Sequence, residues 1–158
     1  MFKWAFTARL ASQTIDDETA FGFLVDGGVS VLLNKYIAFG ATITNAGYVT
    51  AYDSKHEVPP TALQSGITLQ IPNVSIFDFA LHADLYRRAD SDMHFFSGLE
   101  IAYLKILVLR VGYAVRPDTE DGVSGGLGVC FGGISVDYAY EANPSLGGNH
   151  HLRLGLAF

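Results

Sequence analysis

The sequence has few charged residues, one cysteine, five prolines and no long apolar run. Charged residues make up 16% of its 158 residues, against about 25% in an ordinary soluble domain. Cys130 stands alone, which excludes an intramolecular disulfide. The most apolar segment, 106–115, is interrupted by Arg110, and this excludes a transmembrane helix. A net charge of −6, without any basic cluster, argues against a nucleic-acid partner.

Apolar residues are nevertheless abundant, at 49%, and 17 glycines accompany them. High apolar content without a long apolar run is typical of strands in which apolar and polar residues alternate. The length favours a single domain over residues 1–158. Segments with a period of two, separated by turn signals, predict ten strands. These strands are expected at 2–12, 19–33, 36–46, 61–72, 74–88, 93–104, 105–116, 123–132, 133–141 and 149–158.

On each predicted strand, one set of alternate residues is apolar, and the other set collects the charges and glycines. A soluble β-sandwich or lipocalin-like barrel is the alternative, but its polar face would be rich in Lys, Glu and Thr. Here that face has few large polar side chains and many glycines, as expected for a confined interior. A charge on a lipid face would cost about 2–4 kcal/mol at the midplane. We therefore expect an all-β fold, an antiparallel transmembrane β-barrel with about ten strands in this chain. The predicted lumen-facing charged network comprises Arg9, Asp26, Asp78, His82, Asp84, Glu100, Arg110, Asp137 and Arg153.

The predicted connections alternate between tight and longer ones. Tight turns are expected at 34–35, 72–73, 104–105 and 132–133, and the longest loop at 46–60. Short periplasmic turns and longer external loops are the rule in outer-membrane barrels, so we expect a bacterial outer-membrane location. The long loop is the best place for contact with a partner. Five aromatic residues of the apolar parity are expected to anchor the chain at the membrane interfaces: Trp4, Tyr103, Tyr113, Tyr138 and Tyr140.

The C-terminal third carries a series of short motifs. They are Leu109-Arg-Val-Gly-Tyr113, the glycine-rich segment 122–129, Ile134-Ser-Val-Asp-Tyr-Ala-Tyr140, and 145–158 with its alternating end in Phe158. In this order they resemble the PorV/PorQ group of FadL-like outer-membrane proteins of Bacteroidetes and related bacteria. The resemblance implies a role in type IX secretion or in the transport of hydrophobic solutes. Its partners would be outer-membrane lipid, the barrel-assembly machinery, and a secreted cargo protein or a hydrophobic small molecule.

The final strand also resembles the C-terminal strand of outer-membrane barrels, whose terminal aromatic residue belongs to the signal read by the assembly machinery. Leu152, Leu154, Leu156 and Phe158 would form this signal. Barrels of the group have more strands and an N-terminal hatch segment. Residues 1–9 lack the uninterrupted apolar core of a signal peptide. We therefore expect this chain to correspond to the C-terminal portion of a larger barrel. If ten strands closed alone, residues 2–10 would pair with 152–158.

Two other functions stay open. A closed ten-stranded barrel would be filled by side chains and would serve as a surface structural or binding protein without a pore. An outer-membrane protease would use Asp78, His82, Asp84 and Glu100, although its cleft needs longer loops than these. No cofactor is expected, and we do not expect an enzyme. The adjacent His150 and His151 point to opposite faces of a strand, so no metal site is expected there.

Overall fold

The computed structural model describes residues 1–15, 18–50, 59–117, 121–143 and 147–156. Within these ranges it contains ten β-strands. They are β1 (Phe2–Ile15), β2 (Glu18–Leu32), β3 (Ile37–Val49), β4 (Ala62–Val74), β5 (Phe77–Arg88), β6 (Met93–Tyr103), β7 (Leu107–Val115), β8 (Gly122–Phe131), β9 (Ile134–Asn143) and β10 (Gly147–Leu156). The predicted all-β fold and its ten strands are confirmed. No helix in these ranges has the length and apolar character needed to cross a membrane.

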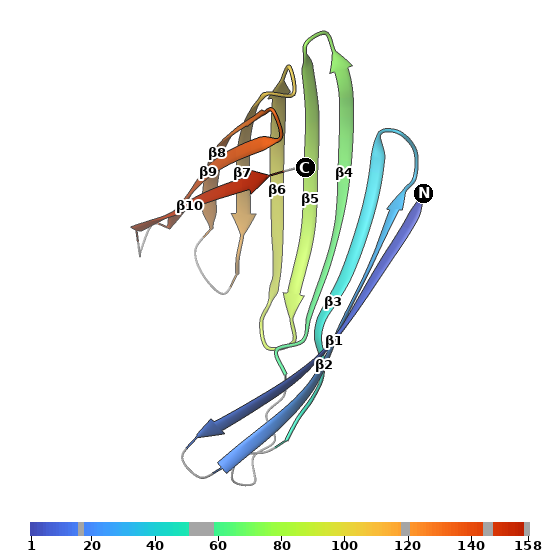
Figure 1. Ribbon diagram of the computed structural model, residues 1–158, viewed down its shortest axis with the longest axis vertical. Helices are drawn as coiled ribbons and strands as arrows, with labels where there is room; N and C mark the ends of the chain where they lie inside the picture. The colour runs from blue at the N-terminus through green and yellow to red at the C-terminus, as the bar shows by residue number, and fades with distance from the viewer. Residues whose placement is uncertain (16–17, 51–58, 118–120, 144–146, 157–158) are drawn as a thin grey trace.

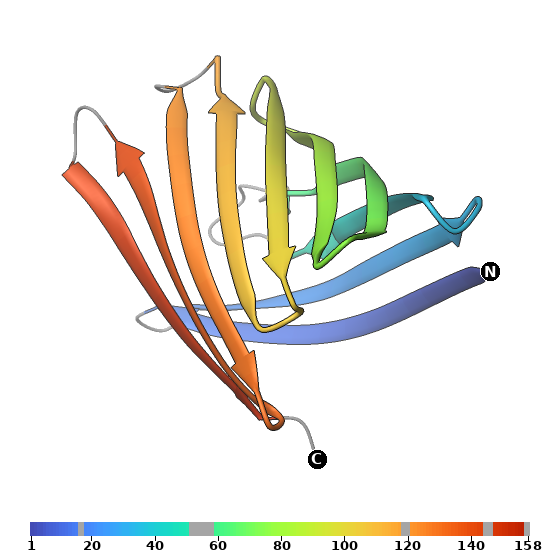
Figure 2. The same cartoon turned by 90° about the horizontal axis from the view of Figure 1, so that it is seen from above.

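The strands form one antiparallel sheet in which each strand pairs with its neighbours in the chain, from β1 to β10. The sheet is strongly curved, so that it encloses a hollow on one side (Figures 1 and 2). We call the concave side the inner face and the convex side the outer face. Strands of 9–15 residues are long enough to cross a bilayer when tilted, since a transmembrane β-strand needs about 9–11 residues.

The sheet does not close into a barrel. Among the described residues, β1 pairs with β2 alone and β10 with β9 alone, so the conditional pairing of 2–10 with 152–158 is not formed. Phe158 itself lies outside the described residues. On the inner face, β1 and β10 both carry basic side chains and neither strand contains Asp or Glu, so their pairing would form no ion pair. These two strands are the edges of the sheet.

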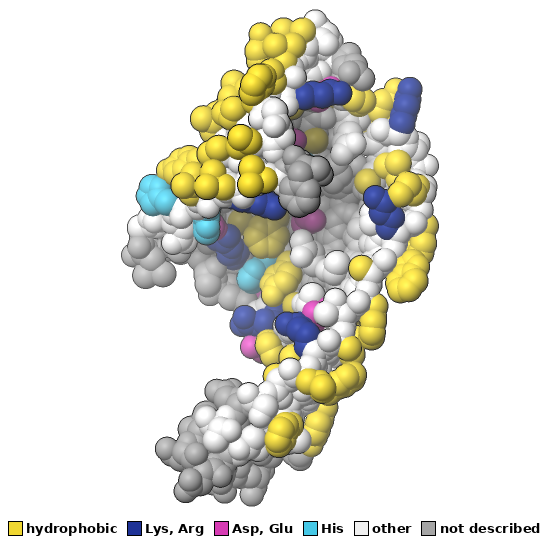
Figure 3. Space-filling view, viewed as in Figure 1, with side chains coloured by type: hydrophobic (Ala, Val, Ile, Leu, Met, Phe, Trp, Pro, Cys, Tyr) yellow, Lys and Arg dark blue, Asp and Glu magenta, His cyan; other side chains and the backbone are white. Residues whose placement is uncertain are grey.

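Apolar and polar side chains divide between the two faces as the alternation predicts. Large apolar side chains of the outer face stay exposed, for example Leu81 at 47%, Leu109 at 50% and Leu154 at 72%. Among the described residues, only Ala20, Ala62 and Ala114 are buried apolar residues. Figure 3 shows charged side chains lining the hollow and hydrophobic ones along the outer rim. The fold therefore has an apolar exterior in place of a packed hydrophobic core.

Tight turns gather at one end of the sheet. Leu104 and Lys105 both have positive φ, as do Gly132 and Gly133, which is the backbone of a type I′ hairpin turn. The turn expected at 72–73 is wrong. Pro72 lies within β4, where the pairing with β5 is irregular between Ile71 and Val74, and the chain reverses at 75–76 instead. Proline has no N–H to donate, so it fits such an irregularity as well as it fits a turn.

The third strand is longer than expected. It continues to Val49, so the first residues of the predicted loop 46–60 are strand. Its pairing with β2 shifts by one residue, so that Thr44 and Asn45 of β3 form a β-bulge opposite Asp26 of β2. Residues 51–58 of the predicted loop lie outside the described residues.

Candidate functional site

The inner face carries the candidate site, and its most connected part is an ion-pair cluster on β6 to β9. Arg110 of β7 donates from Nε to Glu100 of β6 at 2.7 Å and from Nη1 to Asp137 of β9 at 2.7 Å. Glu100 lies directly opposite Arg110 in the β6–β7 pairing. Asp137 is two strands away, beyond β8. One guanidinium thus joins three strands of the sheet.

The glycines of β8 make this long bridge possible. A Cβ atom on Gly128 would lie 2.5 Å from Asp137 Oδ1 and 3.2 Å from Arg110 Nη1. The ion pair therefore passes directly over Gly128, where any side chain would displace it. Arg116 repeats the arrangement near the other end of β8. It donates to Glu141 of β9, and a Cβ on Gly122 would lie 3.0 Å from Arg116 Nη1.

A second cluster lies on β1 to β3 and uses the β-bulge. Arg9 Nη2 lies 2.7 Å from both Asp26 and the Asn45 side-chain oxygen. The backbone N–H of Asn45 donates to Asp26 Oδ1 at 2.7 Å. Asn45 has a φ of 56°, a conformation that asparagine tolerates better than most residues. The bulge in β3 thus places the Asn45 backbone N–H against the Asp26 carboxylate, which also accepts from the Arg9 guanidinium.

The remaining residues of the predicted network lie elsewhere on the inner face. His82 of β5 shares a hydrogen bond of 3.1 Å with the Thr68 hydroxyl of β4. Asp78 lies near the start of β5 and makes a polar interaction there. The Asp84 side chain lies across Gly66, where an added Cβ would be 2.0 Å from its Oδ1. Arg153 lies on the edge strand β10, opposite Asp137. Five of the nine predicted residues therefore lie in the two ion-pair clusters: Arg9, Asp26, Glu100, Arg110 and Asp137. The other four, Asp78, His82, Asp84 and Arg153, lie at separate positions on the inner face.

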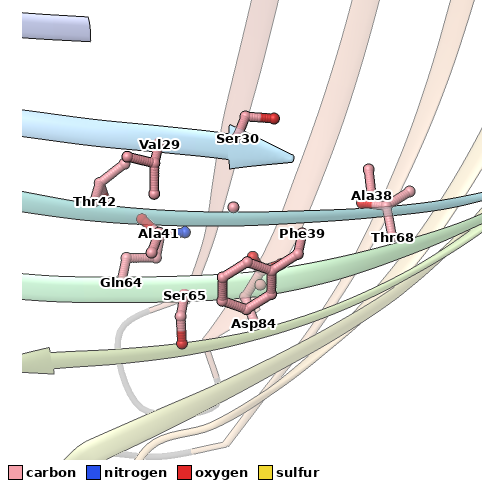
Figure 4. Close-up of a pocket in the computed structure, with 12 residues that line it drawn as sticks. Val29, Ser30, Ala38, Phe39, Ala41, Thr42, Gln64, Ser65, Thr68 and Asp84 are labelled. Atoms are coloured by element: carbon pink, nitrogen blue, oxygen red, sulfur yellow. The ribbon is translucent and has the colours of Figure 1, made fainter. Parts of the chain in front are cut away.

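A depression of about 370 Å³ lies between these clusters, over β2 to β5 (Figure 4). Gly40 leaves room there because it carries no side chain, and the Asp84 side chain occupies the space over Gly66. The polar side chains of the lining are those of Ser30, Thr42, Gln64, Ser65, Thr68 and Asp84. Hydroxyl, amide and carboxylate oxygens of this kind accept hydrogen bonds from a polar or cationic group.

The predicted interfacial aromatics are on the outer face, and all but Tyr138, in the middle of β9, lie toward an end of their strand. Trp4, 71% exposed, and Tyr103, which contacts the Phe77 ring at 5.3 Å, lie toward the tight turns. Tyr113 and Tyr140 lie toward the opposite end. Tyr138 shares a 2.8 Å hydrogen bond with His150, whose ring lies 5.1 Å from Tyr140. In the predicted assembly signal, Leu152, Leu154 and Leu156 are 71–75% exposed on the outer face.

One loop contact lies just outside the strands. The Tyr113 hydroxyl donates to Asp121 Oδ2 at 2.7 Å, and the Arg116 backbone N–H donates to Asp121 Oδ1 at 3.1 Å. These hydrogen bonds hold the pKa of the Asp121 carboxyl below its ordinary value, the bond from Tyr113 having the largest effect. They connect Asp121, directly before β8, to the end of β7.

Asn45, Thr68 and the Arg116–Glu141 pair were not predicted from the sequence. The signal for the last was present, because Arg116 and Glu141 have the same parity as Arg110 and Asp137 on their strands. No family model matches this chain, and no curated protein matches it. The resemblance to the PorV/PorQ group therefore stays a prediction.

Proposed function

We propose that this chain forms part of the wall of a bacterial outer-membrane β-barrel, with its outer face against lipid and its inner face toward an aqueous interior. The observation that supports this most is the division of the two faces. Most large apolar side chains of the described residues are exposed, mainly on the convex side, and the ion pairs lie on the concave side. Exposed apolar surface on this scale is unfavourable in water but suits a bilayer.

The interfacial positions of the aromatics also support the proposal. Tyrosine and tryptophan rings favour the two membrane–water interfaces, and Trp4, Tyr103, Tyr113 and Tyr140 lie toward one or the other end of their strands. The two longest connections, between β3 and β4 and between β7 and β8, lie at the end of the sheet opposite the turns at 75–76, 104–105 and 132–133, which fits the external and periplasmic sides of such a barrel.

Of the two roles that the resemblance implies, we propose secretion, with a polar polypeptide as cargo, over transport of hydrophobic solutes. The inner face presents two ion-pair clusters and a depression lined by hydroxyl, amide and carboxylate groups. A polar polypeptide can exchange hydrogen bonds with such groups. An apolar solute would desolvate them without compensation. Saturable binding of a fluorescent long-chain fatty acid to the inner face would contradict this choice.

The membrane proposal is tested by placing one charge on either face of the same strand. Leu81 points outward, whereas its neighbour Ala80 points inward and lies opposite Glu100. Leu81→Arg should lower the yield of folding into lipid vesicles, because the charge costs about 2–4 kcal/mol at the midplane. Ala80→Arg is the matched control and should fold nearly as well as the parent chain. Equal yields for the two variants would contradict a lipid-facing outer surface.

A further inference from the structure

The edges of the sheet carry an unusual distribution of charge. The chain has 16 acidic and 10 basic residues, yet neither edge strand contains an acidic residue. β1 carries Lys3 and Arg9, and β10 carries Arg153. All three belong to the inner-face parity. Both open edges are therefore positively charged in a chain that is negatively charged overall.

On β10, the neighbouring carboxylate is already engaged. Asp137 lies directly opposite Arg153 in the β9–β10 pairing, but its carboxylate turns across Gly128 to Arg110 at 2.7 Å. Within the part of the chain that the structure describes, Arg153 has no ion-pair partner. Its exposed guanidinium is available to whatever lies beside β10.

On β1, the situation is similar. Arg9 is paired with Asp26, while Lys3, opposite Ser30, has no ion-pair partner among the described residues. Lys3 and Arg153 thus mark the two edges in the same way. In lipid, these edges must be covered, because hydrocarbon offers no hydrogen bonds to the outward backbone N–H and C=O groups.

The charges disfavour pairing of either edge with a second copy of this chain, or of the two edges with each other. A second copy of this chain would have to pair through β1 or β10, and the ten strands closing on themselves would pair the same two. No register of these strands offers a carboxylate to Arg153 or Lys3, since neither strand contains one. Registers that place Lys3, Arg9 or Arg153 opposite one another bring like charges to the short distances found between neighbouring strands, where they are unfavourable.

We propose that both edges accept partner β-strands whose inward-facing residues include carboxylates, so that Arg153 and Lys3 each form an ion pair across the new strand pairing. This inference rests on the proposed barrel wall and specifies the chemistry of the strands that extend it. The backbone hydrogen bonds supply most of the attraction. The two basic residues select an acidic strand and reject a second copy of the chain.

The competing explanation is that the basic residues only protect the edges. Lys on an edge strand commonly discourages pairing with any other strand. Protection predicts that β10 accepts no added strand, whatever its charge. Selection predicts that the edge accepts an acidic strand and that its preference follows the sign of the charge at position 153.

The experiment uses the full chain folded in detergent micelles and two synthetic strand peptides, Leu-Thr-Leu-Glu-Leu-Thr-Leu and its Lys counterpart. Hydrogen exchange of the backbone amides of β10 is the readout. The Glu peptide should slow exchange at the open edge of β10 by roughly tenfold, and the Lys peptide should have little effect. Arg153→Glu should reverse this preference. Lys105→Glu, the same charge change in the turn between β6 and β7, should leave it intact.

Three results would overturn the proposal. Equal protection by both peptides would show that the edge does not select charge. If neither peptide protects the amides of β10, the edge accepts no added strand, whatever its charge. Protection without peptide, together with a dimeric mass, would show that a second copy covers the edge. Protected amides in β3 to β8 show in each case that the sheet is folded. A chain that folds in micelles but stays out of lipid vesicles would instead contradict the proposed barrel wall.

Discussion

At the scale of the residue, glycines decide which side chains can reach one another. The Arg110–Asp137 ion pair crosses β8 only because Gly128 has no side chain. Alternation alone predicted that Arg110 and Asp137 share a face, but not that they meet. Side chains on strands that are two apart are usually too far from each other to form an ion pair. The contact is possible here because Gly128, on the strand between them, has no Cβ atom.

We predict that Gly128→Ala destabilises the sheet by about 1 kcal/mol, because the new methyl group displaces the Asp137 carboxylate and weakens a partly exposed ion pair. Unfolding by urea in detergent measures this. Gly125→Ala on the same strand is the matched control, since its nearest neighbour would be the Arg110 carbonyl oxygen at 3.9 Å. A loss of the same size in the control would point to strand propensity and not to the ion pair.

A pH dependence is expected at Asp121. The folded state lowers the pKa of this carboxyl, so its stabilising contribution is fully present above the unfolded pKa of about 4. The contribution is lost as the pH falls through the lower pKa of the folded state. The Arg116 amide resonance should therefore follow a transition below about pH 4, and Asp121→Asn should remove it. An unchanged transition in that variant would assign it to another group.

At the scale of the element, the strands were largely predictable, whereas their irregularities were not. A period of two identifies all ten strands because each has one apolar and one polar side. The turn between β4 and β5 was predicted at the wrong residues because proline occurs both in turns and at irregularities within a strand, and Pro72 is at such an irregularity. The bulge opposite Asp26 depends on the pairing of β2 with β3, which local sequence does not encode.

Near that bulge, β3 approaches β2 very closely. A Cβ on Gly47 would lie 2.0 Å from the Phe23 carbonyl oxygen, which is a backbone atom and cannot simply rotate away. Gly47→Ala should therefore destabilise the β2–β3 pairing by about 1–3 kcal/mol. Gly40→Ala, on the same strand with its nearest atom at 3.7 Å, should be tolerated much better. Thermal unfolding followed by circular dichroism compares them, and equal melting temperatures would contradict the close approach.

A substitution in the hairpin between β6 and β7 should stabilise the sheet. Leu104 and Lys105 both adopt the left-handed region, which costs about 1–2 kcal/mol for an ordinary residue. Asn-Gly at these two positions is the preferred type I′ sequence and should stabilise the hairpin by about 1 kcal/mol. The midpoint of urea unfolding should rise without a change in slope. A lower midpoint would mean that the Leu104 side chain contributes more than the relieved strain.

At the scale of the whole molecule, the two faces and the two open edges carry the functional interpretation. The composition predicted the apolar exterior, since many apolar residues without an apolar run require alternation. It did not predict that the ten strands would stop short of closure, because curvature and pairing at the edges depend on strands far apart in the sequence. The charges of Lys3 and Arg153 could be interpreted only from the structure, in which β1 and β10 are each paired on one side alone.

The most direct test of the central claim uses Trp4, the one tryptophan in the chain, which is 71% exposed on the outer face. In refolded vesicles, a lipid-facing Trp4 should emit at shorter wavelength than in urea. Lipids brominated near the headgroup should quench it more strongly than lipids brominated near the chain end, whereas aqueous acrylamide should quench it weakly. Strong quenching by acrylamide, with no effect of brominated lipid, would show that the outer face meets water and would contradict the barrel wall.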